Sequence, residues 1–179
     1  MLKNYLKVGL MVLIVLSMLV LLTGCGEKTV TSTYDSDDAK VSVSLTYPES
    51  EDYKWSTNDE DLRTSADKAI LLTPNFKIAI QFDDLAVPKY EKDFSKYKEN
   101  YVTEYEAEDF KVAGLEGFKW YYGGYNATVV SLPLESNPDD ALKVYVYPKD
   151  GDWNKDSAVQ LFNSDDVQNI LKTIKIVAK

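Results

Sequence analysis

An apolar segment near the N-terminus limits which part of this 179-residue chain can form a globular fold. The segment covers residues 8–22, follows Lys3 and Lys7, and ends just before Cys25, the only cysteine of the chain. A permanent membrane helix needs roughly 20 apolar residues, whereas a basic start and a shorter apolar core are typical of a secretory signal. The sequence therefore predicts that residues 1–24 are removed on export; the alternative is an uncleaved signal anchor.

The apolar segment leads into the four residues Leu22-Thr23-Gly24-Cys25. They resemble the lipobox of bacterial lipoprotein signal peptides, in which a small residue precedes a cysteine that is acylated and becomes the new N-terminus. The resemblance implies a diacylglyceryl anchor on Cys25, and several acyl chains on one residue hold a protein stably at a membrane. A lone cysteine in an exported protein also needs such an explanation, because it forms no intramolecular disulfide. We expect a lipoprotein on the extracytoplasmic face of the cell membrane.

The 155 residues that remain after cleavage are enough for one compact core. Residues 26–39 are polar and lack helix or strand periodicity, so we expect residues 25–39 to be the lipidated cysteine and a flexible spacer, and residues 40–179 to be a single domain. Loss of Lys3 and Lys7 changes the net charge from −9 to −11. Such a field repels nucleic acid, so no nucleic-acid partner is expected, and the acidity serves solubility or cation binding.

Strand signals recur along the expected domain. Val41, Val43, Leu45 and Tyr47 alternate with small polar residues, which is the period-two pattern of a half-buried strand. Further segments with strand-like composition lie at 68–72, 76–82, 109–113, 117–122, 125–132 and 141–147, and Tyr53 and Trp55 could add a short strand before them. The segments 68–72 and 76–82 are expected to form a hairpin across Thr73-Pro74-Asn75. The last four segments follow one another across turn residues, so they are expected to form a meander.

Helical spacing occurs at two places. Four aromatic residues lie four, three and four positions apart on one stripe of a central helix: Tyr90, Phe94, Tyr97 and Tyr101. A C-terminal helix is expected after Ser164 as its N-cap, with an i, i+3, i+4, i+7 apolar face: Val167, Ile170, Leu171 and Ile174. The sequence therefore predicts an α+β fold, in which an antiparallel sheet of six or seven strands carries a central helix and a C-terminal helix.

This order of elements resembles the PsbP-like fold over about residues 41–177. The likeness is carried by Tyr47-Pro48 at the end of the first strand, the central helix after Phe82, the glycine-bounded hairpins within 112–132, and the closing segment 170–176. Two features depart from the family. In many relatives a Gly-Trp pair follows soon after the Tyr-Pro pair, whereas here Trp55 comes seven residues after Pro48, behind an acidic insertion. Metal sites of photosynthetic members use histidine, which this chain lacks. The resemblance implies a non-catalytic binding or assembly role in the cell envelope.

The composition excludes several enzyme classes. Without histidine, and with its one cysteine lipidated, the chain cannot form a Ser-His-Asp or Cys-His arrangement or a histidine-ligated metal site. Gly123-Gly124 lies between strand-like segments and precedes no helix, which indicates a turn rather than a phosphate-binding loop. We expect a protein that is not an enzyme; a small hydrolase that uses a Ser-Lys or carboxylate pair is the remaining alternative.

An acidic segment before the last helix is a candidate calcium site. Oxygen side chains recur there at every second position, as in the first half of a calcium loop: Asp150, Asp152, Asn154 and Asp156. Lys155 and Leu161 stand where an EF-hand loop has glycine and glutamate, which excludes that form. A looser Ca²⁺ site would make the protein a calcium-dependent binding module, and the alternative is a solvated polar loop. No other cofactor is expected.

Aromatic residues form a second candidate site. They are concentrated in one strand-like segment and the turn after it, with one more in the acidic segment: Trp120, Tyr121, Tyr122, Tyr125 and Trp153. Because neighbouring strand residues point to opposite faces, Phe118, Trp120 and Tyr122 are expected to share one face. These rings form either a sheet core under a helix or an exposed platform for a partner, which we expect to be an envelope protein or a cell-wall component.

Overall fold

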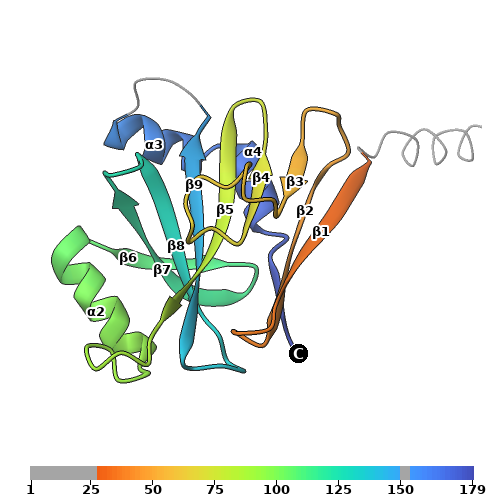
Figure 1. Ribbon diagram of the computed structural model, residues 1–179. Coiled ribbons are helices and arrows are strands. Elements are labelled where there is room, and N and C mark those ends of the chain that lie inside the picture. Colours follow the sequence, from red (N-terminus) through yellow and green to blue (C-terminus); the bar gives the residue numbers. More distant parts are fainter. Residues whose placement is uncertain (1–27, 150–153) are drawn as a thin grey trace, which may run out of the picture.

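The computed structural model describes residues 28–149 and 154–179. The lipobox with Cys25, and three residues of the two candidate sites, Asp150, Asp152 and Trp153, lie outside the described residues. The described part contains two antiparallel sheets and three helices (Figure 1). The α+β class expected from the sequence is confirmed at this level.

A seven-stranded sheet forms the centre of the fold. Its strands are β3 (Lys54–Ser56), β4 (Ala69–Leu72), β5 (Phe76–Asp84), β6 (Glu108–Val112), β7 (Leu115–Tyr122), β8 (Ala127–Pro133) and β9 (Asp140–Pro148). They lie in the order β3-β4-β5-β9-β8-β7-β6, and every neighbouring pair is antiparallel. The predicted hairpin of β4 and β5 and the predicted meander from β6 to β9 are both confirmed, because tight turns join strands that become neighbours.

A separate three-stranded sheet lies beside the large one, in the order β1-β2-β10. Its strands are β1 (Thr29–Ser36), β2 (Val41–Pro48) and β10 (Lys175–Ala178). The prediction of a flexible spacer is therefore wrong for Thr29–Ser36, and the prediction that residues 41–47 belong to the main sheet is also wrong. Backbone pairing with β2 explains the first error, because β1 is held along its whole length although most of its side chains are polar.

Three helices accompany the sheets: α2 (Phe94–Tyr105), α3 (Lys155–Phe162) and α4 (Asp165–Leu171). The carboxylate of Asp93 accepts hydrogen bonds from the backbone N–H groups of Ser95 and Lys96 and so starts α2. Helix α4 follows Ser164 as predicted but ends at Leu171. Helix α3 was not predicted. The polar loop that the sequence analysis gave as an alternative for the segment before α4 is therefore wrong from Lys155 onward. None of the helices in residues 28–149 and 154–179 is long and apolar enough to cross a membrane.

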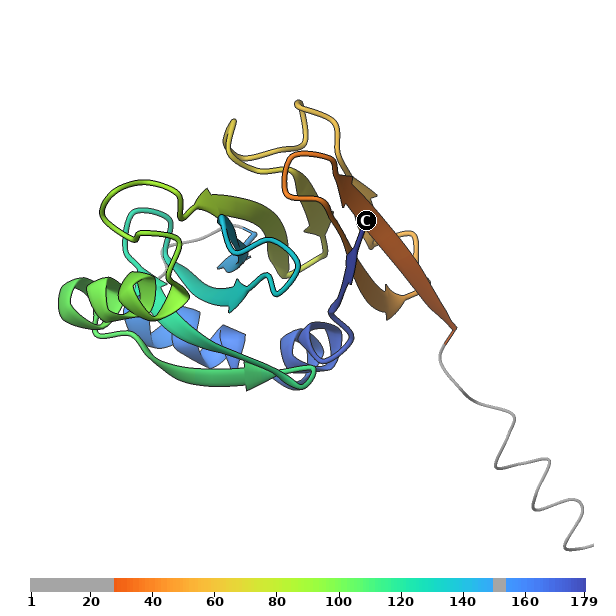
Figure 2. The same cartoon turned by 90° about the horizontal axis from the view of Figure 1, so that it is seen from below.

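The large sheet is buried on both faces, as the side chains of β9 illustrate. Its even-numbered residues Leu142, Val144 and Val146 join the core shared with the small sheet, α3 and α4, whereas Tyr145 and Tyr147 join the core under α2. The small sheet and α2 consequently cover different parts of the molecule. In both views β1 lies on the opposite side of the molecule from α2 (Figures 1 and 2).

Candidate functional site

The structure separates the predicted aromatic residues into buried and accessible ones. Trp120 is only 5% exposed and packs against the rings of Tyr101 and Tyr105 of α2, at centroid distances of 4.7 and 5.0 Å. It therefore belongs to the core under a helix and cannot be part of an exposed platform. Tyr122 and Tyr125 are half-buried neighbours with a centroid distance of 5.1 Å.

Tyr121 faces the other side of the sheet from Trp120 and Tyr122, as the alternation of a strand requires. Its hydroxyl shares a hydrogen bond of 2.7 Å with Oδ1 of Asn126. Tyr121 also lines a small hollow of about 100 Å³ beside α3. The predicted aromatic residues thus lie on two faces and do not form one continuous surface among the described residues.

The two described residues of the candidate calcium loop lie at the start of α3. Asn154 is the N-cap, and its Oδ1 accepts a hydrogen bond of 3.1 Å from the backbone N–H of Ser157. Asp156 lies in the first turn, where a carboxylate interacts favourably with the helix dipole. Within the described ranges no group of three or more histidine, cysteine, aspartate or glutamate side chains could hold a metal ion. Calcium binding by the loop as a whole stays a prediction.

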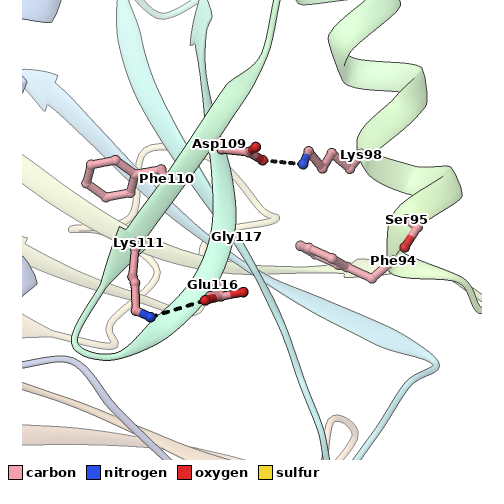
Figure 3. A pocket seen from close by; sticks show the side chains of 8 residues that line it. All are labelled: Phe94, Ser95, Lys98, Asp109, Phe110, Lys111, Glu116 and Gly117. Carbon is pink, nitrogen blue, oxygen red and sulfur yellow. Dashed lines mark hydrogen bonds and ion pairs between the residues drawn. The ribbon is translucent and has the colours of Figure 1, made fainter.

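A hollow of about 580 Å³ lies between α2 and the β6–β7 hairpin (Figure 3). We call it the α2 groove. Residues from three elements line it: Phe94, Ser95 and Lys98 from α2, Asp109, Phe110 and Lys111 from β6, and Glu116 and Gly117 from β7. The sequence did not predict this groove, because its two walls are separate segments that only the tertiary fold brings together.

Two ion pairs set the charge pattern of the α2 groove. Lys98 reaches from the helix to the carboxylate of Asp109 on β6, so this pair spans the groove (Figure 3). Lys111 pairs with Glu116 on the neighbouring strand, with 3.1 Å between Nζ and Oε1. The rim therefore carries both signs of charge in alternation. These residues had no specific signal in the sequence, since alternating charges on a hairpin also occur on any solvated sheet face.

Phe94 supplies the aromatic surface of the groove, next to the backbone of Gly117. The ring of Phe94 packs on Phe118 at a centroid distance of 5.5 Å, whereas Phe110 turns to the other face and meets Phe162 at 5.3 Å. Gly117 has no side chain for a structural reason: a Cβ there would lie 2.2 Å from the carbonyl oxygen of Ser131 on β8. The backbone of β7 therefore forms part of the lining at this point.

A polar cluster is enclosed beneath α2. Nζ of Lys143 lies 2.6 Å from Oδ2 of Asp83 and 3.0 Å from the hydroxyl of Tyr101, and the hydroxyl of Tyr97 donates to Asp83 over 2.8 Å. Lys143 is only 5% exposed. The partners satisfy its charge in the core, which makes the cluster a structural element that fixes α2 against the sheet.

Four buried tyrosines lie in this same core and are called the tyrosine cluster: Tyr97, Tyr101, Tyr145 and Tyr147. Burial raises the pKa of the Tyr145 hydroxyl to about 12. Burial is also the main cause that raises the pKa of the other three, and nearby carboxylates, Asp83 for Tyr97 and Tyr101 and Asp67 for Tyr147, raise it further. All four hydroxyls therefore remain neutral at physiological pH.

No protein-family model, no curated protein and no solved structure matches this chain.

Proposed function

We propose that the protein is a lipid-anchored, non-catalytic binding protein on the extracytoplasmic face of the cell membrane, and that its α2 groove contacts another envelope protein. The observation that carries the proposal is the arrangement of the anchor-proximal strand and the groove. Strand β1 begins at Thr29, only four residues after Cys25, and α2 lies on the opposite side of the molecule (Figures 1 and 2).

The short connection restricts how the domain sits at the membrane. Four residue steps span at most roughly 15 Å when extended. An anchor on Cys25 would therefore hold the Thr29 end of β1 close to the lipid headgroups and leave α2 and its groove directed away from them. A partner that approaches from outside would reach the α2 groove first.

The chemistry of the groove supports binding rather than catalysis. Its two lysines, Lys98 and Lys111, are each paired with a carboxylate, and the chain has no histidine to serve as a general base. The ring of Phe94 among charges of both signs suits a protein surface, because charged groups select partners while apolar contacts give affinity. The resemblance to the PsbP-like proteins supports the same proposal, since it implies a binding or assembly role.

Site-specific photo-crosslinking in intact cells tests the contact. A photoreactive amino acid replaces Ser95, an exposed residue of the groove, and in the matched control it replaces Asp166, an exposed residue of α4. We expect a crosslinked protein partner from position 95 and none from position 166. Crosslinks to cell-wall glycan would replace the protein partner by a cell-wall component, and equal patterns from both positions would contradict the groove as the contact.

The anchor has its own test. Cys25→Ser removes the acylated residue, so the variant should leave the washed membrane fraction. If it stays with the membranes, the lipoprotein part of the proposal is wrong, whatever the crosslinking experiment shows.

A further inference from the structure

Arg63 is the only arginine in a chain with 20 basic residues and 29 acidic ones. Lysine and arginine are not equivalent, because the guanidinium group is planar, stacks on aromatic rings and offers a fork of N–H donors that matches a carboxylate. All nine ion pairs among the described residues use lysine. The guanidinium of Arg63 thus has no carboxylate partner within the described part of this strongly acidic protein.

Two aromatic rings hold the guanidinium of Arg63. Its central carbon lies 4.6 Å from the ring centroid of Tyr125, in the turn after β7, and 4.7 Å from that of Tyr147 on β9. Stacking on rings fixes the plane of a guanidinium and leaves the N–H groups at its edge available. Tyr147 itself is 2% exposed, and its hydroxyl is the one buried side-chain polar atom without a hydrogen-bond partner among the described residues.

A buried carboxylate fixes the backbone that carries Arg63. Oδ2 of Asp67 accepts hydrogen bonds from the backbone N–H groups of Arg63 and Thr64, at 2.9 and 3.1 Å. Its other oxygen accepts a hydrogen bond of 2.6 Å from Nε2 of Gln81 on β5, and Asp67 is only 4% exposed. The large sheet thereby holds an exposed arginine in a defined place, which is the preorganisation that a binding site needs.

Arg63 lines a surface hollow of about 540 Å³. Its lining consists of Asp59, Leu62, Arg63, Thr64 and Ser65. The hydroxyls of Thr64 and Ser65 can donate to an anion beside the arginine. Asp59 also lines this hollow, and its carboxylate disfavours a doubly charged anion such as sulfate more than a singly charged carboxylate.

We propose that Arg63 is the centre of a binding site for the carboxylate group of a small ligand. The guanidinium donates two parallel hydrogen bonds to the carboxylate, and the hydroxyls of Thr64 and Ser65 flank it. This site is distinct from the α2 groove in its residues, and its existence does not depend on the proposed contact with an envelope protein.

Because Arg63 is the only arginine, its side-chain Nε–H gives a single NMR signal that needs no further assignment. The full chain in uncharged detergent micelles is titrated at mildly acidic pH with sodium acetate, sodium sulfate or sodium chloride at equal ionic strength. We expect a saturable shift of this signal with acetate in the millimolar range, a weaker response to sulfate, which is doubly charged at this pH, and none to chloride. An acetate curve that matches the chloride curve, or a stronger response to sulfate, would overturn the proposal.

Variants separate a specific site from general charge attraction. Arg63→Lys keeps the charge but loses the fork, so half-saturation by acetate, followed at the backbone amide of Ser65, should rise at least about tenfold. Lys172→Gln removes a positive charge from an exposed residue elsewhere and should leave the acetate titration unchanged. Equal effects of the two substitutions would show nonspecific attraction and contradict the site.

Discussion

The buried pair of Lys143 and Asp83 gives the sharpest test of how this core is held together. The side chains of Lys143 and Asp83 are 7% and 29% exposed, and Asp83 also accepts a hydrogen bond from Tyr97. Lys143→Met keeps most of the apolar packing but leaves the carboxylate without its cation. Loss of one partner of a buried pair costs about 3–5 kcal/mol, and the partial exposure of Asp83 places the expected loss near the lower end, at about 3 kcal/mol.

The free energy of unfolding, measured by urea denaturation with tryptophan fluorescence, gives this loss directly. The double variant Lys143→Met with Asp83→Asn should recover part of it, because an amide has no charge to leave unpaired and still accepts from Tyr97. Lys111→Met serves as the matched control, since its pair with Glu116 is 64% and 82% exposed and should contribute at most about 0.5 kcal/mol. A loss below about 1 kcal/mol for Lys143→Met, or no recovery in the double variant, would refute the reasoning.

Three further predictions follow from the same structure. The free energy of unfolding should be at its full value below pH 10, where tyrosine is neutral in both states. Above pH 10 tyrosine ionises in the unfolded chain, whereas burial keeps the pKa of Tyr145 at about 12 in the folded protein. The free energy of unfolding should therefore fall by up to about 1.4 kcal/mol per pH unit for each member of the tyrosine cluster. Tyrosinate absorbance should then rise in two phases, the second together with unfolding; one phase near pH 10 with an intact fold would contradict this. Gly117→Ala should lower the thermal midpoint by several degrees, because its Cβ would clash with Ser131, whereas Gly123→Ala, with nothing closer than 3.7 Å, should change it little; equal midpoints would argue against the close approach. The side-chain oxygen of Asn154 already caps α3, so we expect the same thermal midpoint in millimolar calcium as in excess chelator. A higher midpoint in calcium would establish the acidic loop as a metal site.

Local pattern was enough to predict much of the main sheet and the helices α2 and α4. The meander from β6 to β9 joins strands across tight turns, so neighbours in the sequence become neighbours in the sheet. The stripe of Phe94, Tyr97 and Tyr101 predicted α2, because helical spacing alone places these residues on one face. Tyr90 lies just before the helix but still meets Tyr97 edge-on at 4.9 Å.

Long-range pairing determined what local pattern could not. Strand β10 pairs with β2 across more than 120 residues, and β1 gains its order from the same strand although its own composition is polar. Helix α3 is short, and its two buried residues, Ala158 and Phe162, are too few to produce a clear apolar stripe in the sequence. The separate small sheet therefore had no signal that could be read before the fold was known.

The sequence by itself predicted export, from its apolar leader and single cysteine, excluded histidine chemistry, and determined the elements with strong local periodicity. Only the tertiary structure decided that Trp120 is buried, that α2 and a distant hairpin enclose a groove, and that Arg63 lies on the rings of Tyr125 and Tyr147. The reason is physical: periodicity reports which face of an element is apolar, whereas a site depends on which elements meet, and that is set by contacts between residues far apart in the chain.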